Sequence, residues 1–248
     1  YGEAYDNDIT TTAITSPETG VLTAAEAVTM TIKNQGNNTQ TGFDVAFQVD
    51  GGAWVTENVG TLELASEETG DFTFTATADL SATGFHTINV KTMLVGDEQP
   101  NNDEMSIDIT NYGTIIPMVN HDTIDVYECS GTFCDMGGVD GPIMASDGGV
   151  ITFYPEAGKK MKLEFFGVWD ISHQTGGVDP FQIYDGPDMD SPLIGEWTQN
   201  DWRDYGLKPG IIKALGETGA LTIRYLAPTW ITNPPFPEGW TALVGCYT

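Results

Sequence analysis

Apolar and polar residues alternate with a period of two along most of the chain, and this alternation limits the fold more than any other feature. Val28, Met30 and Ile32, for example, alternate with threonine and lysine, and turn sequences such as Asp50-Gly-Gly52 separate runs of this kind. Successive side chains of a β-strand point to opposite faces, so this period is typical of strands with one buried face. Short alternating strands separated by turns predict an all-β fold built as an antiparallel sandwich.

The alternating strands fall into two groups that differ in length and aromatic content. The first group places these residues on one face: Phe43, Val45, Phe47 and Val49; Phe72 and Phe74; Ile88 and Val90; Met105, Ile107 and Ile109. The second group is longer and more aromatic: Met161, Leu163 and Phe165; Phe181 and Ile183; Leu221, Ile223 and Tyr225; Trp240, Ala242, Val244 and Cys246.

The change between the two groups lies near residues 111–120, where Tyr112-Gly113 precedes a short apolar link, Ile115-Ile116-Pro117. The chain has 248 residues, which is enough for two ordinary domains. We therefore predict two β-sandwich domains, residues 1–112 and 113–248, with a short linker at about 111–121.

The charge balance excludes several classes of partner. The chain has 36 Asp and Glu against 9 Lys and Arg, for a net charge of −27. A protein that binds nucleic acid needs a basic face, and anionic membrane surfaces repel an acidic chain. No apolar run reaches the length of about 18 residues that suggests a membrane-spanning helix, so we predict no membrane insertion. Acidity of this kind keeps a secreted protein soluble, and it also permits the binding of divalent cations.

No sequence pattern indicates an enzyme. The chain contains no HExxH motif, no Gly-rich phosphate loop and no Ser/His/Asp framework, and His86, His121 and His173 are scattered singly. With 36 acids, some pair would meet the spacing of a glycosidase by chance. We predict a protein that binds and does not catalyse.

Between residues 6 and 110 the chain contains, in this order, the segments DNDITTTAITSPETGVLTAAEAVTMTIKNQG, FDVAFQVDGGAWV, ADLSATGFHTINV and GDEQPNND. Together they resemble the bacterial adhesion-related, immunoglobulin-like modules called CARDB. Such modules are non-catalytic spacers or adhesive units of surface proteins. The succession of ADLSATG and GDEQPNND is similar to modules in secreted proteins of the Bacteroidota. The resemblance implies an Ig-like first domain in an exported, cell-surface or secreted protein.

The second group of strands contains CSGTFCDMGG at 129–138, ITFYPEAGKKMKLEFFGVWDI at 151–171 and DPFQIYDG at 179–186, followed by SPLIGEW, GALTIRYLA and GWTALVGC. This ordered set resembles a bacterial CUB domain over about residues 127–247. The resemblance implies a jelly-roll β-sandwich that binds proteins or glycans.

In many CUB domains an acid two residues before the first apolar residue of the DPFQIYDG strand helps to bind calcium, and that position is Asp179 here. Asp170 is the candidate second ligand, although the family's acidic position aligns better with Ser172. The aspartate usual after the LTI strand is replaced by Ala227-Pro228. Calcium needs about six to eight oxygens. Calcium at Asp170 and Asp179 is therefore the one candidate cofactor, and we expect little dependence on it.

Asp185, which precedes Gly186 in the same segment, is assigned to a hairpin turn, because Asp-Gly is favoured there.

The chain has three cysteines. Cys246 shares the inward face of its strand, so its partner should come from the start of the same domain. The CUB resemblance aligns Cys129 with the C-x-G-x-F start of similar bacterial domains and implies a Cys129–Cys246 disulfide, with Cys134 free. The alternative pair, Cys134 with Cys246, stays open.

Three aromatic residues in polar loops, Trp202, Tyr205 and Trp230, are candidate ligand-binding residues, because such side chains stack on sugars or anchor protein partners. The alternative is that they cover the sandwich while Trp197 packs in a sheet. The triplet that contains Thr123 (DTI) resembles O-glycosylation sites of the Bacteroidota, which makes Thr123 a candidate acceptor.

These features favour a non-catalytic extracellular adhesion or structural module of a larger bacterial protein. Its expected partners are surface proteins or glycans, neighbouring domains or further copies, and not nucleic acid. One alternative is the accessory region of a secreted protease or glycoside hydrolase. Another is a filament subunit joined by strand complementation, for which an unpaired terminal strand at about residues 1–15 would be the sign.

Overall fold

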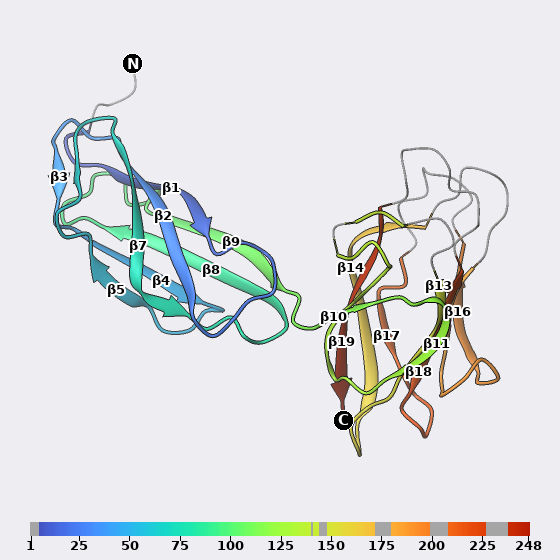
Figure 1. The fold of residues 1–248 in the computed structure, drawn as a ribbon. Helices are drawn as coiled ribbons and strands as arrows, with labels where there is room; N and C mark the ends of the chain where they lie inside the picture. The colour runs from blue at the N-terminus through green and yellow to red at the C-terminus, as the bar shows by residue number, and fades with distance from the viewer. Residues whose placement is uncertain (1–4, 140, 144–147, 172–179, 199–207, 227–237) are drawn as a thin grey trace. The chain divides into compact units, whose positions relative to one another are not determined.

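The computed structural model describes residues 5–139, 141–143, 148–171, 180–198, 208–226 and 238–248. Strands and turns make up these residues, and no helix occurs among them, which confirms the all-β prediction (Figure 1). The chain divides into two compact units, residues 1–111 and 112–248, one residue before the predicted boundary. Among the described residues, no helix has the length and apolar character needed to cross a membrane.

The first unit contains two main sheets in which all pairs are antiparallel. The three-stranded sheet has the order β1 (Ile9–Ser16), β2 (Glu26–Asn34), β7 (Thr69–Ala78). The four-stranded sheet has the order β5 (Val55–Asn58), β4 (Asp44–Val49), β8 (Gly84–Met93), β9 (Glu104–Asn111). A short pair, β3 (Gln40–Thr41) with β6 (Glu63–Leu64), completes the unit.

The alternation seen in the sequence becomes the core of this unit. Val28, Met30 and Ile32 of β2 are fully buried, and alternate residues of β4 and β8 join them in one apolar cluster. Phe47 and Phe74 bridge the two sheets, with ring centroids 4.8 Å apart and planes at 67°. Each sheet therefore buries one face against the other, as in an aligned sandwich.

The first strand is already paired within the unit. Ile9 of β1 lies opposite Asn34 and Ile14 opposite Met30 in an antiparallel ladder with β2. Ile9 is also fully buried in the core. Residues 9–15 therefore do not form the unpaired terminal strand that would indicate a filament subunit, because they pair with β2 and Ile9 is buried in the core.

The second unit contains two five-stranded sheets. One has the order β10 (Ile115–Pro117), β12 (Ser130–Cys134), β19 (Gly239–Tyr247), β14 (Lys160–Asp170), β17 (Ile211–Lys213). The other has the order β11 (Asn120–Val126), β13 (Gly148–Phe153), β18 (Leu221–Leu226), β15 (Phe181–Tyr184), β16 (Leu193–Trp197).

Residues 115–126 supply an edge strand to each sheet of the second unit. β10 runs parallel to β12 in one sheet, and β11 runs parallel to β13 in the other. Ile116 and Met118 are buried in the core at the crossing. The predicted linker at 111–121 is therefore wrong over most of its length. Three residues are too few to show an alternation, so the sequence pattern does not reveal β10.

The predicted inward face of the second unit is confirmed by burial. Met161, Leu163 and Phe165 of β14 are buried, as are the predicted residues of β15, β18 and β19, except that Cys246 is only partly buried against this core. Trp240 lies at the centre of an aromatic cluster, with its ring centroid 4.6 Å from that of Tyr225. Trp197 packs against the same core from β16, as the structural alternative for this residue predicts.

Candidate functional site

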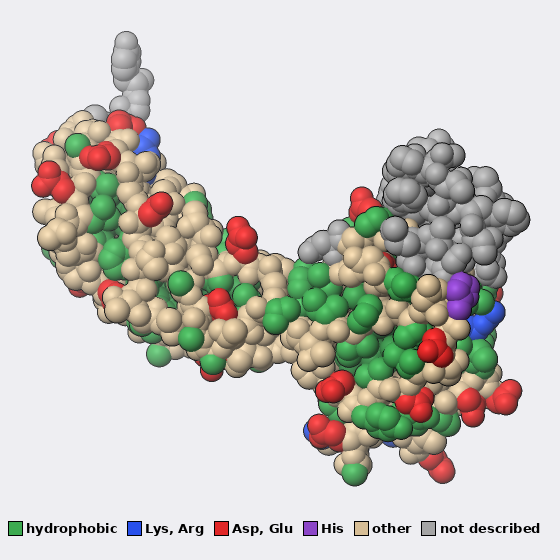
Figure 2. All heavy atoms as spheres, viewed as in Figure 1, with side chains coloured by type: hydrophobic (Ala, Val, Ile, Leu, Met, Phe, Trp, Pro, Cys, Tyr) green, Lys and Arg blue, Asp and Glu red, His purple; other side chains and the backbone are tan. Residues whose placement is uncertain are grey.

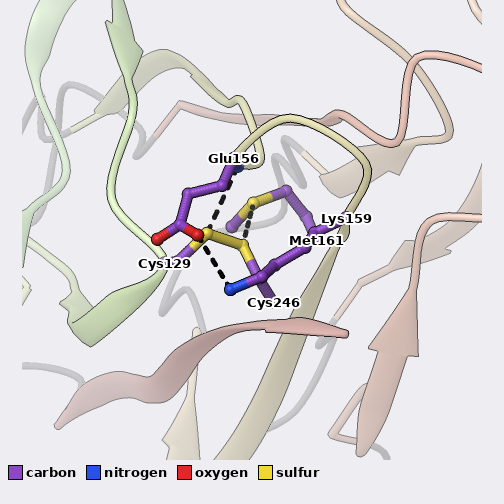
Figure 3. Close-up of a disulfide and its surroundings, with 5 residues drawn as sticks. All are labelled: Cys129, Glu156, Lys159, Met161 and Cys246. Atoms are coloured by element: carbon purple, nitrogen blue, oxygen red, sulfur yellow. Dashed lines mark hydrogen bonds and ion pairs between the residues drawn. A yellow bond between two sulfur atoms is a disulfide. The ribbon is translucent and has the colours of Figure 1, made fainter. Parts of the chain in front are cut away.

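The disulfide closes the second unit where β12 begins and β19 ends. The antiparallel ladder places Ser130 opposite Gly245, so the neighbouring Cys129 and Cys246 face each other with Cα atoms 5.0 Å apart (Figure 3). The two residues form a disulfide, in agreement with the pairing that the CUB resemblance implies. The alternative with Cys134 is wrong, because Cys134 lies opposite Thr241 further along this ladder.

Cys134 is a free and fully buried thiol. Burial, together with the neighbouring Asp135 carboxylate, raises the pKa of Cys134 to about 12. The thiolate is the reactive form of cysteine, so this residue is chemically inert at neutral pH.

Asp185 has a larger role than the predicted hairpin turn. Its backbone N–H donates to Pro192 O (2.8 Å) and closes the β15–β16 hairpin. Its carboxylate accepts hydrogen bonds from the backbone N–H groups of Leu215 and Gly216, each at 3.0 Å. Asp185 therefore fastens the loop after β17 to the hairpin, a contact between distant segments that no sequence motif indicates.

Only one of the two candidate calcium ligands lies within the described residues. Asp170 ends β14, and its Oδ2 accepts a hydrogen bond from Glu238 N (3.1 Å). Asp179 lies outside the described residues, as do the candidate ligand-binding residues Trp202, Tyr205 and Trp230. Within the described ranges, no group of three or more His, Cys, Asp or Glu side chains could hold a metal ion. Calcium binding at Asp170 and Asp179 stays a prediction.

Thr123 lies on the exposed part of β11. Its backbone N–H donates to Asp122 Oδ1 (2.8 Å), within the DTI triplet that suggested an O-glycosylation site. The exposed position leaves Thr123 open to modification, and its role as an acceptor stays a prediction.

His86 is the perturbed basic group of the first unit. It is 7 % exposed and lies between Ala82 O (2.7 Å from Nε2) and Asp50 Oδ2 (2.8 Å from Nδ1). Burial alone would lower the pKa of His86, but the hydrogen bonds to Ala82 and Asp50 outweigh it and raise the pKa above the ordinary value. His86 thus joins two turns of the sandwich.

Three carboxylates, those of Asp8, Asp97 and Asp103, interact at one end of the first unit. Burial, together with the charges of Asp97 and Asp8, raises the pKa of Asp103 to about 6. Asp97 Oδ2 accepts a hydrogen bond from Ile9 N (2.9 Å), and Asp103 Oδ1 accepts one from the Thr92 hydroxyl (3.1 Å). These acids hold loops together while repelling one another.

A stacked pair of tyrosines lies at one end of the second unit. The parallel register pairs Val126 of β11 with Phe153 of β13, so the next residues, Tyr127 and Tyr154, emerge side by side. Tyr154 N donates to Val126 O (2.8 Å), which extends the ladder by one bond. The two rings are stacked, with centroids 5.1 Å apart and planes at 14°. Tyr127 is 70 % exposed.

These tyrosines border a cavity of about 420 Å³, called here the tyrosine cavity. Residues 155–159 between β13 and β14, Lys160 at the start of β14 and the pair Glu217-Thr218 before β18 form the rest of its lining. Glu156 forms an ion pair with Lys159 (2.8 Å), and its backbone N–H donates to Cys129 Sγ (3.4 Å), so the cavity adjoins the disulfide (Figure 3). Sequence reasoning missed this site, because it depends on the parallel register of β11 and β13.

A comparison with family models places a CARDB domain at residues 6–107. This match agrees with the CARDB resemblance in the sequence and supports a non-catalytic, cell-surface-associated module. The search of the curated proteins finds no match for this chain.

Several solved structures are similar to parts of the chain. One is a CARDB domain from Pyrococcus furiosus, with 20% identity over 44% of this chain and 96% of that chain, at a TM-score of 0.34. Another is a domain of a candidate cell surface protein from Methanosarcina acetivorans, with 28% identity over 42% of this chain and 90% of that chain, at a TM-score of 0.34. A third is the calcium-bound CUB2 domain of MASP-1, with 18% identity over 49% of this chain and 96% of that chain, at a TM-score of 0.35.

Proposed function

We propose that this chain is a non-catalytic extracellular module of a larger bacterial surface or secreted protein. In this role it serves adhesion or acts as a stalk, and it binds protein or glycan partners through its second unit. The observation that carries the proposal is the CARDB domain at residues 6–107, joined to a second all-β sandwich that presents a solvent-open cavity.

Two properties of the chain support an extracellular location. The disulfide joins residues 117 positions apart, and disulfides persist mainly in oxidising compartments outside the cytosol. The net charge of −27 favours solubility and disfavours association with anionic surfaces. Figure 2 shows acidic side chains over both units and few lysines or arginines on the same face.

Antibodies against residues 1–248 test the location and the larger protein together. Intact cells of the source organism should bind the antibody, and protease treatment of intact cells should remove the signal. On a blot, the band should be heavier than this chain. An antibody against a cytosolic protein is the control. A signal that appears only after lysis would refute the proposed location.

A further inference from the structure

We propose that the tyrosine cavity is a glycan-binding site, in which the ring of Tyr127 stacks on the apolar face of an uncharged sugar. This inference rests on the proposed function and deepens it, because it names the ligand class and the residues that bind it. The residues that line the site are all described, and none of them is among the candidate binding residues that the sequence suggested.

The first argument is the exposure and fixed orientation of an aromatic ring. Tyr127 is 70 % exposed although it stacks on Tyr154, so much of its apolar ring lacks a protein neighbour. The stack on Tyr154, just beyond the β11–β13 ladder, restricts the orientation of the ring before any ligand arrives. A rigid aromatic side chain of this kind offers a large amphipathic contact at a low cost in conformational entropy.

The second argument is the mixture of polar groups around the ring. Thr218, Glu217 and the Glu156–Lys159 ion pair place donors and acceptors around the same cavity. A sugar hydroxyl is both a donor and an acceptor, so it can satisfy either kind of group. A wholly apolar ligand would displace water from these polar groups and offer them no hydrogen bond in return. The volume of about 420 Å³ lies within the range of roughly 300–1,000 Å³ usual for small-ligand pockets.

The third argument is charge, which indicates an uncharged sugar. Glu156 and Glu217 line the cavity, and burial, followed by the charges of Asp125, Tyr127 and Asp188, raises the pKa of Tyr154 in the stack. These carboxylates and the net charge of −27 repel negatively charged ligands such as uronic or sulfated sugars. Lys159 and Lys160 line the cavity as well, and Glu156 and Glu217 balance their charge. A lining with no net charge favours an uncharged glycan over an ionic ligand.

An array of immobilised neutral, uronic and sulfated glycans tests the proposal with the full chain. Wild-type protein should bind neutral glycans, and the tightest neutral oligosaccharide should then be titrated in solution. Tyr127→Ala should weaken its affinity by about tenfold or more, as expected for a central aromatic contact, while Tyr127→Trp should retain it. Phe85→Ala is the matched control, because Phe85 is another exposed aromatic (55 %) in the first unit.

The melting temperature of each variant checks that folding is intact, which is expected because Tyr127 is largely exposed. Equal affinity in wild type and Tyr127→Ala would overturn the site. Binding only to acidic glycans, to a protein partner alone or to nothing on the array would overturn the ligand class. All these outcomes leave the proposed function standing, since that depends on the antibody labelling of intact cells.

Discussion

Removal of the Cys129–Cys246 disulfide should destabilise the second unit alone. The perturbation is the double variant Cys129→Ser/Cys246→Ser. In the chain-entropy model, a cross-link between residues 117 apart restricts the unfolded chain and contributes about 5 kcal/mol. The disulfide also packs locally, because Cys246 Sγ lies 3.5 Å from Met161 Sδ and Cys129 Sγ accepts from Glu156 N.

Differential scanning calorimetry of the full chain measures this loss. For a domain of this size, a change of 1 kcal/mol moves the melting temperature by about 4 °C, so the second unit should melt about 20 °C lower. The first unit contains no cysteine and serves as an internal reference. A non-reduced digest of the wild type should yield the linked pair of peptides that contain Cys129 and Cys246.

The control is Cys134→Ala, which removes a buried sulfur atom but no cross-link. Its effect should be limited to the loss of core packing, and addition of a reductant to the wild type should reproduce the double variant. A shift of only a few degrees in the double variant, or an equal shift of both units, would refute the entropy argument.

Three further outcomes are expected. Separately expressed 1–111 and 112–248 should each melt cooperatively, since each has its own core; aggregation of either alone would contradict this boundary. His86 has a raised pKa, so the free energy of unfolding of 1–111 should rise as the pH falls from about 8 to about 6. Asp103, whose pKa is raised to about 6, should add to this rise mainly below that pH. Urea titrations at several pH values should show a smaller rise in the free energy of unfolding for His86→Gln than for the wild type. An equal rise in both proteins would exclude His86 as the source of the pH dependence. Calcium should not raise the melting temperature of 112–248 more than magnesium at equal ionic strength; a calcium-specific rise lost in Asp179→Asn would show the opposite.

The sequence predicts many of the buried positions in strands that are long enough to alternate, although Phe72, Met105 and Ile107 are only partly buried. Val28, Met30 and Ile32 illustrate this, because each step of two returns a side chain to the core face. The pairing of strands is less accessible, since it depends on contacts between distant segments. β10 and the parallel register of β11 with β13 leave no local signal, and the tyrosine cavity depends on that register.

Candidate site residues show the same limit. The sequence does not distinguish Tyr127 from other tyrosines, because its role depends on the ring of Tyr154, which the fold places beside it. Asp185 resembles a turn residue locally, yet its carboxylate binds backbone N–H groups thirty and thirty-one positions away. The disulfide was predicted correctly because family resemblance supplied the long-range information that spacing does not.

The disulfide and the tyrosine cavity belong to one structural arrangement at this end of the second unit. Cys129 follows Tyr127 by two residues, so the cross-link to β19 fixes the chain just beyond the stacked ring. On the other side, Glu156 lines the cavity and donates its N–H to Cys129 Sγ (Figure 3). The disulfide therefore restrains the chain next to Tyr127, and a hydrogen bond to the same sulfur atom restrains the turn that contains Glu156. A stacking platform held in this way loses little conformational entropy on binding, which allows a small contact area to give measurable affinity.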